Sequence, residues 1–457
     1  MKIRTLIPLL TLLVPVLKAE TLVVLSGNSI QEKIDAASDG DIIAIFGGTY
    51  NQNITVNKKV RLVELAGQDV YITGSVTFTD LEETPPFQGF RVGGINIRGA
   101  KGLVIKDVDC DGALTLWGNG IPDVLVAGGS QGRIVQRAGS LVVNSASIQG
   151  NIEQTAGSLV VNSSAVAQNF AVSGESEKTI AFRSVIQGDC NWSGAEGYKG
   201  WFGYGEAQSF YTEGSNSSFV VVGSTLDVNQ NRRPALYLSA DESHSVIINN
   251  VITGTLVNDR PYASTIFTNE NNGSGVIRNN YITHRHTYNR ESYGVVEISP
   301  NSTDYKIESN CIYHSTSSDP ARIWYFKAPF GVTIDSNYCI FDGRGDVYGA
   351  IGHVDTATVT NQVVLRSSTP EDLFLDGDYY NLSADSPLKD LGISSPRYND
   401  RDGSRNNIGP SGGSWYDPEG WTTENPVVIS FDLSPDQVLG GVNDEVEISE
   451  IQAISAP

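Results

Sequence analysis

The sequence has little of several residue types, and each shortage narrows what the chain can be. Only 1 Met, 4 Cys and 5 His occur among 457 residues, and 31 Lys and Arg face 52 Asp and Glu. The resulting formal charge of −21 argues against nucleic acid, or an anionic membrane surface, as the main partner. The sequence also has no Gly-rich phosphate loop, Cys/His zinc spacing or nucleophile elbow. These shortages favour an acidic, exported protein.

Long apolar runs are missing after the N-terminus. Residues 1–19 begin with Lys2 and Arg4, continue through an apolar stretch that two prolines interrupt, and end at Ala19. This stretch is shorter than the roughly 20 apolar residues that span a bilayer. It therefore predicts a secretory signal peptide, with an N-terminal anchor as the alternative. No later segment is predicted to cross a membrane, so we expect a secreted or cell-surface protein, and a monomer.

The four cysteines do not have the spacing of a metal-binding set. Cys311 and Cys339 fall on adjacent repeats, but they are offset by one residue when the repeats are aligned. In strands, that offset turns the two side chains to opposite faces. We expect buried single thiols at these positions and at Cys110 and Cys190, with a Cys311–Cys339 disulfide as the alternative.

Repetition is what the chain has in abundance. The octet AGSLVVNS at residues 138–145 recurs unchanged at 156–163, and Gln136 recurs as Gln154. Self-similarity at a short period is typical of chains that stack copies of one unit. A left-handed hexapeptide helix would also give this period. It is excluded because steps of six from Leu141 meet polar residues instead of conserving an apolar position.

The repeat lengthens to nearly thirty residues between about 220 and 350. A step of the form Asn/Ser-Asn followed by apolar residues recurs on each long coil, which predicts one stacked column of asparagines. Asn tolerates the left-handed turn conformation and can bond its neighbours above and below. The column consists of Asn250, Asn280, Asn310 and Asn337. The extra residues form loops that would build a wall or groove on one side: 254–263, 284–293, 314–321 and 342–348.

Two stretches resemble one known family. Residues 28–62 read NSIQEKIDAASDGDIIAIFGGTYNQNITVNKKVRL, where Ser29 can cap a short amphipathic helix up to Ala37. Residues 371–392 read EDLFLDGDYYNLSADSPLKDLG, and residues 400–413 read DRDGSRNNIGPSGG. Over about residues 25 to 410 the chain resembles secreted right-handed parallel β-helix proteins of the pectate-lyase-like superfamily. The family pattern has Pro-Gly where this chain has Phe46-Gly47.

The resemblance implies an all-β, single-stranded right-handed parallel β-helix, or β-solenoid, with an N-terminal capping helix. It does not choose among lyases, hydrolases, epimerases, adhesins and inert scaffolds. We expect a signal peptide over 1–19, the β-helix over 20–380 and a C-terminal cap over 381–424. Residues 425–457 would form a short β-rich tail, suited to attachment or sorting.

Basic and aromatic residues gather in the long coils of this otherwise acidic chain. Aromatic faces pack against sugar rings, and Arg pairs with carboxylates or sulfates. This cluster therefore predicts a site for an anionic polysaccharide over residues 284–327. Expected substrate contacts are Arg285, His286, Tyr288, Glu297, Trp324, Lys327 and Arg344.

Lyases of the resembled superfamily remove the proton beside a uronate carboxylate with a basic side chain. By that analogy, Arg290 or Arg322 would be the base, and His284 or His314 would donate a proton to the leaving oxygen. The alternatives are a glycan-binding surface without chemistry and a solvated loop surface whose cations pair locally. A hydrolase with paired aspartates is disfavoured, because no Asp pair stacks on neighbouring coils there.

Asp107, Asp109 and Asp111 begin like a calcium loop. The twelfth position of an EF-hand loop needs Glu and here is Gly118, which excludes that motif. In a strand the three carboxylates would share one face and could still hold Ca²⁺, with a solvated face as the alternative. The sequence thus predicts a polysaccharide-binding protein, a lyase on a uronate-containing glycan if it is an enzyme. The alternative is a non-enzymatic structural or adhesin-like solenoid.

Overall fold

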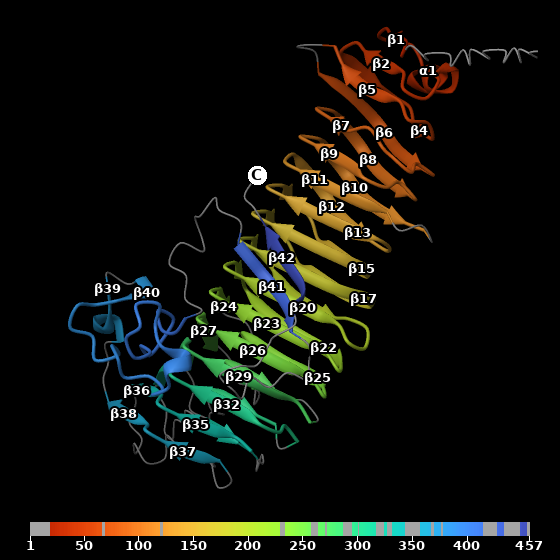
Figure 1. Cartoon of the computed structure of the whole chain (residues 1–457). Coiled ribbons are helices and arrows are strands. Elements are labelled where there is room, and N and C mark those ends of the chain that lie inside the picture. Colours follow the sequence, from red (N-terminus) through yellow and green to blue (C-terminus); the bar gives the residue numbers. More distant parts are fainter. Residues whose placement is uncertain are drawn as a thin grey trace, which may run out of the picture.

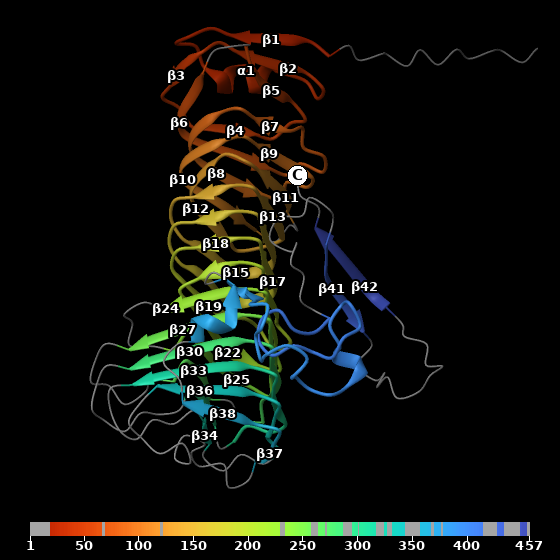
Figure 2. The same ribbon diagram turned by 90° about the vertical axis from the view of Figure 1, so that its left-hand side faces the viewer.

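The computed structural model shows a rod of stacked coils, each wound from short parallel strands (Figures 1 and 2). The fold is a right-handed parallel β-helix, so the fold class predicted from the repeat and from the resemblance is confirmed. The structure describes residues 19–65, 69–118, 122–228, 234–256, 264–269, 272–286, 295–299, 301–316, 324–326, 331–342, 357–366, 370–375, 378–414, 427–433 and 448–454.

A separate three-stranded parallel sheet begins the rod and consists of β1 (Thr21–Val24), β2 (Ile42–Ile45) and β5 (Arg61–Glu64). The expected helix is present as α1 (Ile30–Ala36). Ser29 accepts a hydrogen bond from the Glu32 amide at 3.1 Å, as an N-cap does. Ile30 and Ile34 are fully buried, so the apolar face of this helix points into the end of the rod.

Most other strands form three stacks that run along the rod as one hydrogen-bonded system. The first stack consists of β3 (Gly48–Tyr50), β6 (Val70–Thr79), β8 (Arg91–Arg98), β10 (Asp109–Trp117), β12 (Ser130–Gln136), β14 (Ser147–Ile148), β16 (Ala165–Val166), β18 (Val185–Ile186), β21 (Glu206–Ala207), β24 (Thr225–Val228), β27 (Val251–Leu256), β30 (Tyr281–His286), β33 (Cys311–Thr316), β36 (Tyr338–Asp342) and β38 (Val363–Arg366).

The second stack shares the long strands β6, β8, β10 and β12 with the first and adds β4 (Ile54–Val56), β15 (Ile152–Asn162), β17 (Phe170–Phe182), β19 (Asp189–Ser193), β22 (Ser209–Ser215), β25 (Leu236–Asp241), β28 (Ile266–Thr268), β31 (Val296–Ile298) and β34 (Trp324–Phe326). The third stack shares β15 and β17 with the second and adds β7 (Phe87–Gln88), β9 (Leu103–Lys106), β11 (Asp123–Ala127), β13 (Ser140–Asn144), β20 (Lys199–Gly203), β23 (Ser218–Val222), β26 (His244–Ile248), β29 (Ser274–Arg278), β32 (Tyr305–Glu308), β35 (Thr333–Asp335) and β37 (Thr358–Thr360).

The repeated octet shows why the coils stack in register. Ser140–Asn144 pairs residue by residue with Ser158–Asn162 on the next coil. Alternate residues of a strand point to opposite faces, and Leu141 and Val143 are fully buried inside the coil. Equivalent residues on neighbouring coils therefore touch, and one apolar core runs along the rod.

The predicted asparagine column is confirmed. Asn280 Nδ2 donates to Asn310 Oδ1 at 2.9 Å, and Asn310 Nδ2 donates to Asn337 Oδ1 at 2.9 Å. Each Nδ2 also donates to a backbone carbonyl, as Asn310 does to Ile277 at 2.8 Å. These side chains are fully buried, so the ladder satisfies polar groups that would otherwise face the core.

Serine takes the place of asparagine at the same corner of the short coils. The Ala146 amide donates to Ser164 Oγ at 3.2 Å, and the Ser164 amide donates to Ser184 Oγ at 3.3 Å. The two ladders meet where the Ser224 amide donates to Asn250 Oδ1 at 2.9 Å. One corner of the coil thus uses the same bonding scheme with two side-chain lengths.

The C-terminal segment, residues 370–375 and 378–414, lies along the side of the long coils (Figure 2). Its elements are η2 (Pro370–Leu373), β39 (Phe374–Leu375), β40 (Asp378–Leu382) and η3 (Pro396–Tyr398). Asn249 Nδ2 donates to the Pro410 carbonyl at 2.8 Å, and the Ile393 amide donates to Ser309 Oγ at 2.8 Å. The sequence predicts a cap from residue 381, whereas the structure shows this segment hydrogen-bonded to one flank, across several coils.

A buried ion pair lies beneath this segment. Arg278 and Glu308 are in register on β29 and β32, and Arg278 Nη2 donates to Glu308 Oε2 at 2.6 Å. The guanidinium also lies 3.7 Å from the centre of the Tyr398 ring. The segment therefore buries a charge pair as well as apolar side chains.

The last described residues form an antiparallel hairpin of β41 (Val427–Leu433) and β42 (Ile448–Ile454). The expected signal peptide, residues 1–19, lies outside the described residues except for Ala19. In the described part of the chain, no helix has the length and apolar character needed to cross a bilayer.

Candidate functional site

Much of the predicted cationic site lies outside the residues that the structure describes. This applies to Arg290, Arg322, Tyr288, Lys327 and Arg344. For His286 and Trp324 the structure describes the backbone strand and not the side chain. The roles predicted for these residues stay predictions.

His284 and His314 are stacked, as predicted from the alignment of coils. They pair in register on β30 and β33, with ring centroids 5.0 Å apart and an interplanar angle of 72°. Both side chains are 0% exposed, and His284 Nδ1 lies 3.0 Å from Thr265 Oγ1. Strand alternation puts them on the same face as the core residue Ile282. This burial separates both imidazoles from any glycan on the outer surface, which disfavours the predicted proton donation.

Two other predicted contacts are described. Arg285 is exposed and pairs in register with Thr255 and Ser315, so it faces outward. Burial raises the pKa of Asp227, and the charge of Arg285 offsets part of that rise. Glu297 is buried and accepts a hydrogen bond from Ser264 Oγ at 2.9 Å. Only Arg285 of these predicted contacts is open to a ligand in the described residues.

The predicted calcium row does not form. Asp107 lies in a turn with φ of 50°, whereas Asp109 and Asp111 lie on β10. The turn takes the Asp107 carboxylate away from the strand face and places it against Gly128. A Cβ at position 128 would collide with the Asp107 carboxylate oxygen. No group of three or more His, Cys, Asp or Glu among the described residues could hold a metal ion. The extended strand assumed for all three aspartates is thus wrong at its first residue.

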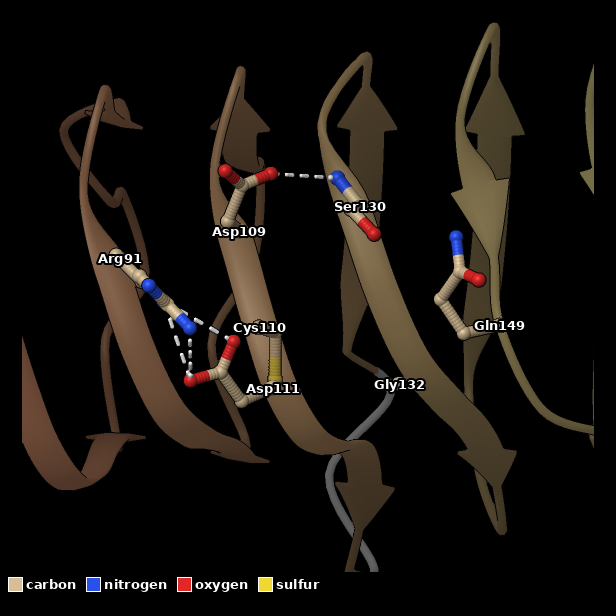
Figure 3. A pocket seen from close by; sticks show the side chains of 7 residues that line it. All are labelled: Arg91, Asp109, Cys110, Asp111, Ser130, Gly132 and Gln149. Atoms are coloured by element: carbon tan, nitrogen blue, oxygen red, sulfur yellow. Dashed lines mark hydrogen bonds and ion pairs between the residues drawn. The ribbon is translucent and has the colours of Figure 1, made fainter.

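A hollow in the described surface lies around the other two aspartates (Figure 3). This groove has a volume of about 300 Å³ and opens to solvent on the flank of the short coils. Most ligand sites are concave and carry a few convergent polar groups. Its lining consists of Arg91, Asp109, Cys110, Asp111, Ser130, Gly132 and Gln149.

Glycines explain why the surface is hollow there. A Cβ at Gly132 would collide with the carbonyl oxygens of Asp111 and Gly112, and one at Gly112 would collide with that of Gly93. The strands shift register at this bend, between Cys110 and Ala113. Consecutive coils can therefore approach closely only because no side chain stands at these positions.

An ion pair fixes one side of the groove. Arg91 Nε lies 3.2 Å from each oxygen of Asp111, and the guanidinium lies 4.8 Å from the centre of the Tyr71 ring. The Tyr71 hydroxyl donates to Asp111 Oδ2 at 3.0 Å. The hydrogen bond with Asp111 raises the pKa of Arg91, and that carboxylate also raises the pKa of Tyr71. Arg91 therefore stays charged, and its positive charge compensates the negative charge of Asp111.

Uncharged groups and one further carboxylate form the other side. Asp109 Oδ1 accepts a hydrogen bond from the Ser130 amide at 2.9 Å. Gln149 Nε2 donates to Ser147 Oγ at 2.9 Å. Burial raises the pKa of Cys110 to about 11, so its thiol stays neutral at physiological pH. The groove thus offers a carboxylate, an amide and a hydroxyl on a floor of paired strands.

Sequence reasoning did not find this groove. The sequence predicts Asp109 and Asp111 as metal ligands, and it assigns no role to Arg91, Ser130 or Gln149. A signal for the bend does exist, since Gly93, Gly112, Gly132 and Gly150 recur once per coil. A glycine column at coil spacing indicates a close approach of successive backbones.

The cysteines are as expected. All four are buried and free, so none forms a disulfide. Cys339 pairs with Ile312 and not with Cys311, which confirms the predicted offset. Burial raises the pKa of all four thiols, to about 12 for Cys339. No thiolate nucleophile is available at these positions.

Comparison with solved structures shows a likeness in fold. The chain is similar to a solved structure described as the crystal structure of pectate lyase Pel9A, with 13% identity and a TM-score of 0.31. The match covers 86% of this chain and 96% of the other. No protein-family profile and no curated protein sequence matches the chain. The fold assignment therefore rests on the strand register of this chain itself.

Proposed function

We propose that this chain is an extracellular polysaccharide-binding β-helix that holds a glycan on the outer surface of its coils. The observation that carries the proposal is the groove of about 300 Å³ around Asp109 and Asp111. Its polar groups come from four successive coils, on or next to β8, β10, β12 and β14. Groups held by hydrogen-bonded strands are already in place, so little ordering free energy opposes binding.

The predicted anionic-glycan site on the long coils is a second part of this proposal. Arg285 supports it as an exposed cation on β30. Lyase chemistry there would rest on Arg290 or Arg322 as base, because the buried His284 and His314 are poorly placed to reach a bound glycan. The proposed lyase step is removal of the proton beside a uronate carboxylate, followed by loss of the leaving oxygen.

A non-enzymatic structural solenoid is the second candidate. The burial of His284 and His314 favours it, because stacked imidazoles inside the coil continue the core and serve no surface reaction. In this case the terminal hairpin β41–β42 would belong to an attachment region, and no glycan would bind.

Affinity electrophoresis of the purified full chain tests the proposal. The gels would contain pectate, alginate, a sulfated glycan or a neutral glucan, xylan or mannan. We expect at least one to retard the chain. Ser130→Trp, which fills the groove, should abolish that retardation. Ser218→Trp places the same bulk at an exposed position on β23, in the third stack and outside the groove lining, and should leave it unchanged. Absence of retardation in every gel would overturn glycan binding and favour the structural solenoid.

The lyase expectation needs its own assay. Ultraviolet absorbance of the unsaturated product would be followed with pectate and with alginate. We expect an increase for the wild type that the double variant Arg290→Ala/Arg322→Ala loses. If both proteins give the same slope, the two arginines are not the base. If neither gives a signal, while retardation persists, the chain binds glycan without cleaving it.

A further inference from the structure

The only cation lining the groove is already occupied. Arg91 contacts Asp111 through Nε and Nη2, each at 3.2 Å, and its guanidinium lies over the Tyr71 ring. Asp111 is held in turn by the Tyr71 hydroxyl. A ligand carboxylate would therefore have to compete with Asp111 for the guanidinium. The remaining charged side chain of the lining is the Asp109 carboxylate, which would repel it.

The groups left for a ligand are suited to hydroxyls. Asp109 uses Oδ1 to accept from the Ser130 amide, which fixes its carboxylate and leaves Oδ2 to accept from a ligand. Gln149 uses Nε2 to donate to Ser147, which leaves its Oε1 as an acceptor. Ser130 Oγ can donate or accept. Two directed acceptors and one hydroxyl match the vicinal hydroxyl groups of a sugar.

We infer that this groove binds a neutral, hydroxyl-rich sugar residue and discriminates against uronates. The inference rests on the proposed function. It states which class of sugar residue binds in the groove on the short coils. It differs from the anionic glycan that the sequence predicts for the long coils. Asp111 is the specificity-determining residue, because it neutralises Arg91.

The bound chain would run along the rod. Asp109, Ser130 and Gln149 lie on successive coils, which are about 4.8 Å apart. A ligand that contacts all three therefore crosses the strands. An oligosaccharide should consequently bind more tightly than a monosaccharide.

Isothermal titration of the full chain tests the inference. The titrants are the neutral hexasaccharides of β-glucan, β-mannan and xylan, and, as the anionic probe, hexagalacturonate. We expect a neutral hexasaccharide to bind, and Asp109→Ala to weaken it about tenfold or more, as loss of a hydrogen bond to a charged group does. Asp123→Ala should have no effect, because Asp123 is an exposed aspartate on β11, in the third stack, and does not line the groove.

A second variant tests the role of Asp111. Asp111→Asn keeps the shape of the side chain and releases Arg91 from its ion pair. We expect this variant to gain affinity for hexagalacturonate about tenfold or more, while circular dichroism shows an unchanged fold.

The outcomes separate the inference from the proposed function. Hexagalacturonate that binds the wild type more tightly than every neutral probe, and that loses this binding in Ser130→Trp, would occupy the groove. That result would overturn the inference and leave glycan binding intact. Equal binding of a neutral probe by wild type and Asp109→Ala would also overturn it. Binding of neither class would overturn both.

Discussion

The same column of outward-facing residues has two different environments along the rod. We call it the flank column, and its members pair in register from coil to coil: Tyr71, Arg91, Asp109, Ser130, Ser147, Ala165, Val185, Glu206, Thr225, Val251, Tyr281, Cys311, Tyr338 and Val363. On the short coils these positions are mostly polar and open to solvent. On the long coils they are apolar and covered by the C-terminal segment.

Tyr281 shows the covered environment most clearly. Its ring lies 4.9 Å from the ring of Phe374 and 4.5 Å from that of Tyr379, and it is 1% exposed. Asp109, eight coils toward the N-terminus in this column, is exposed beside the groove. The β-helix backbone is the same in both regions. Side-chain identity at one position per coil therefore decides whether a flank binds the rest of the chain or is left for a ligand.

The largest effect is expected from the corner ladder. In Asn310→Ala four hydrogen bonds of the amide disappear inside the rod. At about 1 kcal/mol each, this should destabilise the long coils by about 4 kcal/mol. Ser184→Ala, at the same corner of a short coil, should cost only about 1 to 2 kcal/mol. Denaturant unfolding of both variants measures the difference. Equal losses would mean that the two ladders are interchangeable.

Breaking the buried Arg278–Glu308 ion pair should destabilise the fold nearly as much. Glu308→Ala leaves the Arg278 charge buried and without its carboxylate, which costs about 3 kcal/mol or more. The double variant Arg278→Met/Glu308→Leu removes both charges and should recover most of the loss. Thermal unfolding followed by circular dichroism compares the three proteins. A double variant no more stable than Glu308→Ala would show that the apolar contacts of Arg278 matter more than its charge.

Loosening the C-terminal segment should turn a covered flank into an open one. Leu388 is fully buried against the flank, and its replacement in Leu388→Ala should cost about 2 kcal/mol or more. Cys311 lies beneath the segment, whereas Cys339 lies in the interior core. A thiol reagent should therefore label Cys311 faster in the variant and leave the rate at Cys339 unchanged, as peptide mass spectrometry can show. Parallel acceleration at both sites would indicate general unfolding instead.

The smallest effect concerns Asp400. Its Oδ1 accepts from the amides of Gly413 at 2.6 Å and Asn407 at 3.2 Å, and burial raises its pKa. A raised carboxyl pKa favours the folded state at low pH, and this contribution is lost as the pH rises through the folded pKa. Asp400→Asn keeps the acceptor without the charge. It should stabilise the chain by less than about 1 kcal/mol at pH 7, and the gain should vanish near pH 3.

The pH series also provides the control for Asp400. Thermal midpoints of wild type and Asp400→Asn should converge as the pH falls. If the variant is instead less stable at pH 7, the carboxylate is stabilised by its two amide donors more than it is penalised by burial.

Sequence reasoning was most successful where the chain repeats itself. The octet, the column through Asn280 and Asn310, and the offset of Cys311 and Cys339 follow from aligning coils, because identical rungs must stack in register. The register of His284 and His314 was predicted too. Their inward orientation was not, since a position count from Ile282 was needed to tell the two faces of that strand apart.

The rest depended on segments without a repeat. Residues 381–414 have no partner in the sequence that would tell where they dock, so a cap was the natural expectation. Their docking site is visible only once Tyr281 and Cys311 are seen as outward and apolar. The groove around Asp109 is hard to predict because it depends on the lack of side chains at Gly112 and Gly132.

The duplicated octet also means that the molecule has a removable layer. Because Ser140 and Ser158 occupy equivalent places, excision of residues 138–155 would join Arg137 to Ala156 and let the later strand rest where the earlier one had been. Nothing beyond the two adjoining layers would need to adjust. The length of such a rod is therefore set by the number of coils. A version with fewer or more coils needs no redesign of its two ends.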